Sequence, residues 1–214
     1  MTGLVLHGYW RSSATYRVRI ALNLKGLDYT QLAHELRTGA QRESGYLAVA
    51  PHGLVPALDH GGNVLIESPA ILEWIETRWP EPPLLPSSPE DAATVRAMAA
   101  LIACDIHPLQ NLRVLKALKR EFGATKQQTD SWAAHWIAEG FAALEVLIER
   151  FGAGYAFGDT PTLADCYLVP QVYNANRWGI DVSAYPRLSA ASAAALHLPA
   201  FAAAQPERQP FLDQ

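Results

Sequence analysis

The pattern of apolar residues changes at a proline- and serine-rich stretch, residues 80–89. Before this stretch, short runs typical of strands alternate with helical runs. After it, segments 90–107, 109–122, 126–151 and 162–178 carry apolar residues at helical spacing. Clusters of proline and serine are typical of linkers. The sequence therefore predicts a small α/β domain at residues 1–83 and an all-helical domain at residues 90–214.

The first domain is predicted to contain two successive strand–helix patterns. Residues 4–6 form a buried strand, residues 14–25 a helix that ends at a glycine, and residues 29–36 a second strand. Residues 57–60 and 64–66 flank a Gly-Gly-Asn turn and predict a hairpin. Ser68 is predicted as the N-cap of a helix that runs to about Arg78, with proline at its first position. The order is β-α-β followed by β-β-α.

Composition excludes several classes of protein. The net charge of −4 gives no reason to expect nucleic acid or an anionic membrane as the main partner. No apolar run is long enough to span a bilayer, and the first residues do not resemble a signal peptide. Cys104 and Cys166 are far apart in apolar helical segments, so we expect inert core thiols, no disulfide framework and no metal site. These features predict a cytoplasmic protein.

A helix N-terminus follows Arg11 and offers the first candidate for chemistry. Ser12 and Ser13 stand where unpaired N–H groups and the positive end of the helix dipole suit an anion. A serine hydroxyl at this place could donate to a bound thiolate, which raises the ionised fraction of a thiol. The alternative is that either serine is only an N-cap.

Two further segments of the first domain could bind a peptide. A cis bond between Val55 and Pro56 would leave the Val55 backbone free to pair with an extended ligand, whereas a trans bond would make this an ordinary strand start. Glu67 and Ser68 begin another predicted helix and could hold the ammonium and carboxylate of an amino acid. His52, which precedes the Val-Pro pair, either reaches the same ligand or is solvent-exposed.

The chain resembles the zeta-class glutathione transferases over nearly its whole length. The segment from Ser12 to Leu22, SSATYRVRIAL, is similar to the class motif S-S-C-x-x-R-V-R-I-A-L. The segment from Ile106 to Asn111, IHPLQN, resembles the family's I-x-P-L-Q-N, and residues 158–172 resemble its later helix. The residues around His107 and Cys166 are also similar to bacterial maleylpyruvate isomerases.

The resemblance implies a two-domain glutathione transferase fold, with an N-terminal thioredoxin-like α/β domain that binds glutathione and a C-terminal all-α domain that binds substrate. It implies that Ser12, Arg11 and Ser13 are catalytic. The residues expected to bind the glutathione cofactor are His52, Val55, Pro56, Glu67, Ser68, His107 and Asn111, of which His107 and Asn111 are four apart and would share a helix face. Arg11, Arg113 and Arg177 are expected to bind the carboxylates of a small dicarboxylic acid.

The implied activity is a glutathione-dependent cis–trans isomerisation of maleylacetoacetate, in a homodimer. Maleylpyruvate isomerisation, general conjugation of electrophiles and a non-catalytic interaction module remain alternatives. The class motif has a cysteine where this chain has Ala14, so the working thiol must come from glutathione. Thr162 and Asp165 fit a capping box and are expected to be structural.

Overall fold

The computed structural model describes residues 3–209 and divides the chain into two compact units. Unit 1 comprises Met1–Leu84 and His197–Gln214, of which residues 3–84 and 197–209 are described, and unit 2 comprises Leu85–Leu196. The sequence assigned residues 197–209 to the second domain, whereas in the structure they pack with the first. The assignment of glutathione to one domain and substrate to the other stays a prediction.

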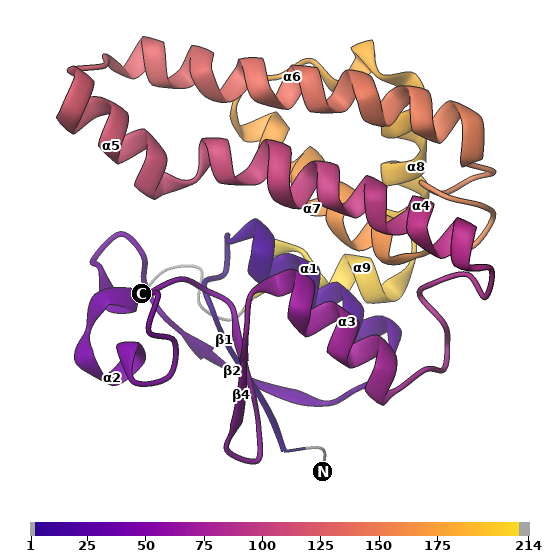
Figure 1. Ribbon diagram of the computed structural model, residues 1–214, viewed down its shortest axis with the longest axis horizontal. Coiled ribbons are helices and arrows are strands. Elements are labelled where there is room, and N and C mark those ends of the chain that lie inside the picture. The colour runs from indigo at the N-terminus through magenta and orange to yellow at the C-terminus, as the bar shows by residue number, and fades with distance from the viewer. Residues whose placement is uncertain (1–2, 210–214) are drawn as a thin grey trace. The chain divides into compact units, whose positions relative to one another are not determined.

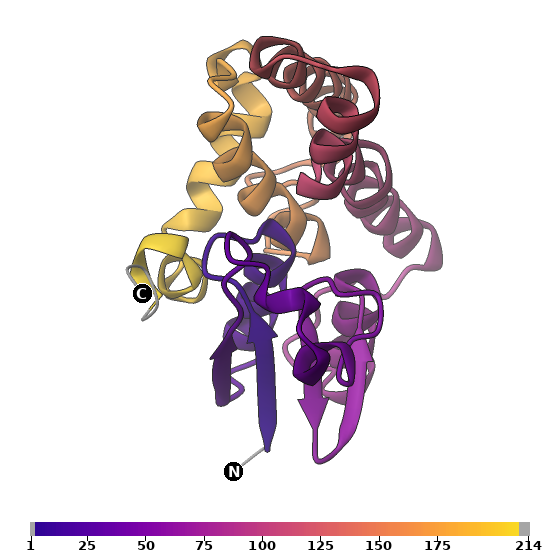
Figure 2. The ribbon, with the colours of Figure 1, turned by 90° about the vertical axis from the view of Figure 1, so that its left-hand side faces the viewer.

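Unit 1 is built on a four-stranded mixed sheet of order β2-β1-β3-β4 (Figure 2). The strands are β1 (Leu4–Gly8), β2 (Tyr29–Ala33), β3 (Ala57–His60) and β4 (Asn63–Ile66). β1 pairs parallel with β2 and antiparallel with β3, which forms the predicted hairpin with β4. The second strand was predicted to reach residue 36. It stops at Ala33 because that residue pairs with Gly8, the last residue of its neighbour.

Helices cover both faces of this sheet. α1 (Ser13–Leu24) and α3 (Ser68–Arg78) lie on one face and the short α2 (Ser44–Leu47) on the other (Figure 1). Ile20 and Leu22 of α1 and Ile71 and Ile75 of α3 are fully buried, which anchors both helices by burial of apolar side chains. α9 (Pro199–Ala204) packs against α1.

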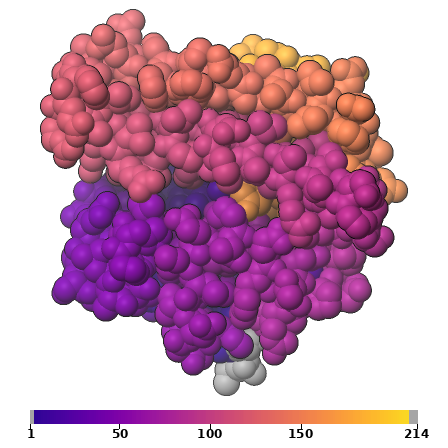
Figure 3. Space-filling view, viewed as in Figure 1, coloured from indigo at the N-terminus to yellow at the C-terminus, as the bar shows by residue number. Residues whose placement is uncertain are grey.

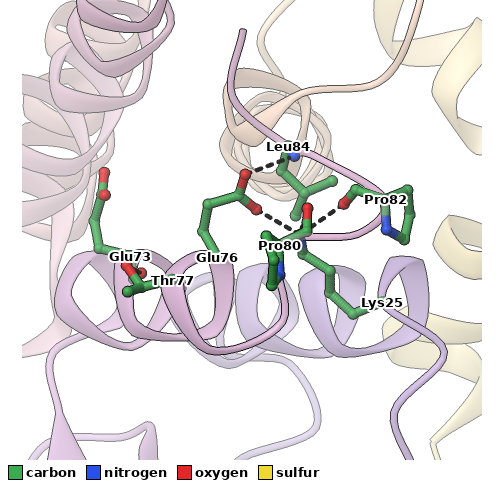
Figure 4. A network of polar contacts seen from close by, with 7 residues as sticks. All are labelled: Lys25, Glu73, Glu76, Thr77, Pro80, Pro82 and Leu84. Carbon is green, nitrogen blue, oxygen red and sulfur yellow. Dashed lines mark hydrogen bonds and ion pairs between the residues drawn. The ribbon is translucent and has the colours of Figure 1, made fainter. Parts of the chain in front are cut away.

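A buried lysine ties the end of unit 1 to its first helix (Figure 4). The Lys25 Nζ lies 2.6 Å from the Glu76 Oε2 and donates to the Pro80 carbonyl at 3.3 Å and the Pro82 carbonyl at 2.6 Å. The other carboxylate oxygen of Glu76 accepts from the Leu84 N–H at 3.0 Å. The Lys25 side chain has no exposed surface, so these partners together offset its desolvation.

Unit 2 consists of helices in the part of the chain that the structure describes, as predicted. They are α4 (Pro89–Ala100), α5 (Leu112–Phe122), α6 (Lys126–Phe151), α7 (Leu163–Arg177) and α8 (Pro186–Leu196), with a π-helical turn at Leu101–Ile106 after α4. α7 packs on α4 and α8, and α6 on α8 and the π-helical turn. The exposed side of α5 lies on the face of unit 2 drawn in Figure 3.

One stretch within the segment Pro89–Phe122 is long and apolar enough, by length and composition, for a membrane-spanning helix. The expectation that no run is long enough is therefore wrong by this measure. The backbone breaks inside the segment, because Asn111 has the extended angles φ −62° and ψ 144°. Val95, Ile102 and Ile106 are buried in unit 2, as in the core helix of a globular domain, which can be equally long and apolar.

Candidate functional site

Ser12 is the N-cap of α1, and its hydroxyl oxygen accepts from the Thr15 N–H at 3.2 Å. A serine hydroxyl has one hydrogen to donate besides the lone pairs with which it accepts. Because the cap bond uses a lone pair, the hydrogen stays available to an anion in front of the helix. The two interpretations of Ser12, as a cap and as a thiolate partner, are therefore compatible in one geometry.

The neighbours of Ser12 differ in their exposure. Ser13 is the first residue of α1 and is buried, whereas Arg11 and Ala14 are partly exposed. The Arg11 guanidinium lies over the Trp10 ring, 5.3 Å from its centroid, an arrangement that holds the cation beside the helix start. Arg11 and Ser12 are thus better placed than Ser13 to meet a ligand.

The Val55–Pro56 bond is cis, the first of the two possibilities that the sequence left open. The ladders of β3 with its neighbours begin at Ala57, so the Val55 backbone lies outside them. The Leu54 carbonyl accepts from the Tyr46 hydroxyl at 2.6 Å, which fixes the approach of this loop to the strand. Burial raises the pKa of Tyr46, so the hydroxyl keeps the proton that it donates.

Glu67 and Ser68 begin α3, but not as predicted. Ser68 is the first helical residue and no side chain caps the helix, because the N-cap position belongs to Glu67. Glu67 has φ 67° and ψ 116°, and it is the one non-glycine residue with positive φ among residues 3–209. A non-glycine backbone in this region persists only where its surroundings impose it, and such residues gather at ligand sites.

Ser68 is hydrogen-bonded to a buried arginine of α1. Its hydroxyl oxygen accepts from the Arg17 Nη1 at 3.2 Å, and both residues are buried. The first turn of α3 contains no acidic residue. The positive end of this helix and the guanidinium therefore favour an anion at the same place.

His52 lies beside the start of α3. Its Nε2 is 3.6 Å from the Glu67 Oε1, and its Nδ1 is buried without a hydrogen-bond partner in the described structure. The structure thus brings His52, in the loop that precedes Val55, close to Glu67 at the start of α3. A buried nitrogen without a partner is the kind of group that a ligand satisfies.

Unit 2 carries the four remaining predicted site residues. His107 begins a 3₁₀ turn, His107–Gln110, and Asn111 follows as the N-cap of α5, where its Oδ1 accepts from the Arg113 N–H at 3.1 Å. The expectation that His107 and Asn111 share one helix face is wrong, because the extended backbone of Asn111 separates the turn from the helix. Arg113 is exposed, and so is Arg177 at the end of α7.

Two histidines that pack near Tyr46 were not among the residues predicted from the sequence. The His7 Nδ1 and the His34 Nε2 lie 3.0 Å apart, and the His34 ring packs 4.1 Å from the Tyr46 ring. Burial lowers the pKa of His7, against a smaller upward effect of Asp59. Burial and then the neighbouring His7 lower the pKa of His34. They are 27 residues apart, and no local pattern announces the pair.

Other sequence expectations have clear outcomes. The capping box of Thr162 and Asp165 is confirmed, and burial raises the Asp165 pKa to about 6. Cys166 is buried as expected, whereas Cys104 is exposed, so its prediction as a core thiol is wrong. No group of three or more potential metal-binding side chains occurs among residues 3–209.

Comparisons with known proteins show the family of the chain. Residues 11–78 match the family "Glutathione S-transferase, N-terminal domain", and residues 130–194 match "Glutathione S-transferase, C-terminal domain". Maleylpyruvate isomerase of Ralstonia sp. is 47% identical over 96% of this chain and 98% of its own length. Maleylacetoacetate isomerase of Pseudomonas aeruginosa is 49% identical over 96% and 97%.

Two solved structures resemble the chain over nearly its whole length. A glutathione-bound maleylacetoacetate isomerase from Anaeromyxobacter dehalogenans superposes with a TM-score of 0.89 at 42% identity, over 98% of each chain. A holo maleylpyruvate isomerase, described as a bacterial glutathione S-transferase of the zeta class, superposes with a TM-score of 0.95 at 47% identity, over 97% of this chain and 99% of its own. This chain belongs to the glutathione S-transferase family, and within it to the zeta class.

Proposed function

We propose that this protein is a glutathione-dependent cis–trans isomerase that converts maleylacetoacetate to fumarylacetoacetate. The observation that carries the proposal is the Ser12 hydroxyl, whose oxygen is engaged by the Thr15 N–H while its hydrogen can be donated at the start of α1. Relatives named as maleylacetoacetate and maleylpyruvate isomerases match nearly the whole chain and support the reaction class.

The residues of unit 1 fit glutathione group by group. A tripeptide thiol needs a partner for its sulfur, a strand-like partner for its backbone and a place for its amino-acid end. Ser12 suits the first, and the Val55–Pro56 segment, outside the ladders, suits the second. The acid-free start of α3 at Ser68, with Glu67 beside it, suits the third, and the buried His52 Nδ1 can pair with the ligand.

When bound, glutathione supplies a thiolate, a nucleophile that can add to a carbon–carbon double bond and leave again. The chain's own part is to keep the sulfur ionised. The Ser12 O–H donates to it, and the N-terminal end of α1 favours its negative charge. The Arg11 guanidinium lies next to Ser12 and stabilises charge that develops on a carbonyl oxygen.

Further residues are proposed to bind ligands on the evidence of family motifs. His107 and Asn111 are proposed to contact glutathione. Arg113 and Arg177, both exposed, are proposed to bind substrate carboxylates together with Arg11, since guanidinium groups pair with carboxylates through two parallel hydrogen bonds. The protein is proposed to act as a cytoplasmic homodimer, which sedimentation of the purified protein would test.

Maleylpyruvate is the second candidate substrate. It is supported by the holo maleylpyruvate isomerase that superposes with a TM-score of 0.95. An absorbance assay of both substrates, each with and without glutathione, decides between them through the ratio of kcat/KM. A rate that does not depend on glutathione would contradict the central proposal, and rapid conjugation of apolar electrophiles without isomerisation would replace it with general transferase activity.

The role of Ser12 can be separated from its capping role by three variants. Ser12→Ala removes both functions, Ser12→Asp keeps a capping oxygen but has no proton to donate, and Ser12→Thr keeps both. We expect Ser12→Thr to retain most of the turnover, and the other two variants to lose about tenfold or more, because one donor to a developing or bound anion has effects of this size or larger. Full activity of Ser12→Asp would refute the donor role.

A further inference from the structure

A buried arginine links the two helix N-termini of unit 1. Arg17 lies in the second turn of α1, five positions after Ser12, and its Nη1 donates to the Ser68 Oγ at 3.2 Å. Arg17 is 2% exposed and Ser68 is 3% exposed. Arginine is almost never buried to this degree unless it has partners. The contact joins residues that are 51 positions apart in the sequence.

The hydrogen bond has a direction that matters. A guanidinium has no acceptor, so Arg17 donates and the Ser68 oxygen accepts. The Ser68 hydrogen is then left for another acceptor, and donation from a cation makes this hydroxyl a stronger donor in turn. Ser68 thus acts as a relay from a buried positive charge to the start of α3.

The surroundings at the start of α3 favour an anion. The first turn of the helix has no acidic residue, so no side chain of that turn neutralises its positive end. The preceding Glu67 is exposed, has φ 67°, and does not cap the helix with its side chain. The Ser68 hydroxyl is therefore the side-chain donor at the first residue of α3. Arg17 adds a full positive charge within one hydrogen bond of this position.

We propose that Arg17 is a positioning residue for the α-carboxylate of the γ-glutamyl group: it orients the Ser68 hydroxyl and raises the positive potential at the α3 start without touching the ligand. This proposal rests on the proposed binding of glutathione. It separates two tasks on α1, since Ser12 at its start acts on the sulfur and Arg17 acts on the other end of the same ligand.

Arg19 provides a matched control on the same helix. It is fully buried like Arg17, but it donates to the backbone carbonyls of Ala204 and Trp10, both at 3.0 Å. Replacement of Arg19 therefore removes an equally buried guanidinium of α1 without changing Ser68. Effects shared by the two variants report on packing, and effects confined to Arg17→Met report on the carboxylate.

The test compares two ligands by titration calorimetry on the full chain: glutathione and its analogue with the γ-glutamyl α-carboxylate replaced by a carboxamide. The natural protein is expected to prefer glutathione by about tenfold or more. Arg17→Met is expected to lose this preference, with a raised KM for glutathione and a kcat at saturation that stays within about twofold. Arg17→Lys, which keeps the charge, is expected to restore part of the preference, and Arg19→Met to keep it.

Several results would overturn the proposal. They are an unchanged preference in Arg17→Met, or an equal loss in Arg19→Met. If Arg17→Met does not fold, Arg17→Lys is made both in the natural protein and in the Ser68→Ala variant. It must weaken the preference for glutathione over the carboxamide analogue in the natural protein. It must have little effect on that preference in the Ser68→Ala variant. Equal effects of Arg17→Lys in both backgrounds would contradict the relay. If the natural protein binds neither ligand, the proposed function fails and the inference fails with it.

Discussion

The buried carboxylate of Asp165 allows a stringent test of how unit 2 is held together. Asp165 is fully buried in the first turn of α7. One oxygen accepts from the Ala156 N–H at 2.8 Å, and the other accepts from the N–H and the hydroxyl of Thr162 at 2.8 and 3.1 Å. One side chain therefore closes both the loop before the helix and the helix end itself.

Replacement of Asp165 by alanine leaves two buried N–H groups without acceptors. Each costs about 1–3 kcal/mol, so we expect a loss of about 3–5 kcal/mol in the free energy of unfolding. This is a large part of the roughly 5–15 kcal/mol that holds an ordinary domain. Asp165→Asn keeps one acceptor but turns an NH₂ group toward a donor, and we expect an intermediate loss. Urea denaturation followed by circular dichroism measures both.

Asp181 is the matched control. It also caps a turn, accepting from the Ser183 N–H at 3.0 Å and the Ser183 hydroxyl at 2.6 Å, but it is exposed. Water can replace it as the acceptor, so Asp181→Ala should cost far less than Asp165→Ala. A loss below about 1 kcal/mol for Asp165→Ala, or equal losses for the two variants, would refute the reasoning.

The same carboxylate predicts a pH dependence. Burial raises the Asp165 pKa from 3.8 to about 6, so the folded state binds more protons than the unfolded state between these values. A group of this kind stabilises fully below its unfolded pKa, and its contribution falls as pH rises through the folded one. The stability of the natural protein relative to Asp165→Asn should therefore decrease by about 2 kcal/mol from pH 4 to pH 7.

Two further perturbations are predicted from the packing. In Gly140→Ala, the new Cβ would meet the Ile106 Cδ1 at 2.2 Å, so the free energy of unfolding in urea should fall by about 1–3 kcal/mol. Gly45→Ala is the control, because the space around Gly45 is open and no such loss is expected. Equal stability of the two variants would contradict this prediction. The pKa values of His7 and His34 lie below 6.5, so the unfolded state takes up protons first, and stability present above about pH 6.5 is lost as pH falls toward the folded values. His34→Gln should weaken this acid dependence, and an identical pH profile would argue against it.

Local patterns were sufficient to predict most elements of the fold. The helix start at Ser12, the Gly-Gly turn of the hairpin and the proline-rich linker each depend on a few neighbouring residues. The second strand was predicted too long because its end is set by pairing with β1, which a local pattern does not contain. The same holds for Asn111, whose capping geometry interrupts a segment with uniform helical spacing.

The parts of the candidate site that could not be predicted depend on contacts across the sequence. Ser68 was expected to cap its helix, but its oxygen is used by Arg17 from another helix. Arg17 belongs to the class motif, but its buried contact with Ser68 is not visible in the sequence, where an arginine on a helix is most often solvated. The His7–His34 pair escaped for a similar reason, since neither residue belongs to a recognisable spacing.

The return of the C-terminal segment to unit 1 has a consequence for synthesis on the ribosome. The Arg19 Nε donates to the Ala204 carbonyl, 185 positions later, and the Asn23 side chain donates to the Ala200 carbonyl. These acceptors emerge only after all of unit 2 has been translated. The sheet of unit 1 is translated first, but the buried Arg19 guanidinium of α1 has no Ala204 carbonyl to donate to until the last part of the chain is made. Nascent chains that end between residues 197 and 199 should therefore contain all of unit 2 but an incomplete unit 1, although unit 1 began to emerge first.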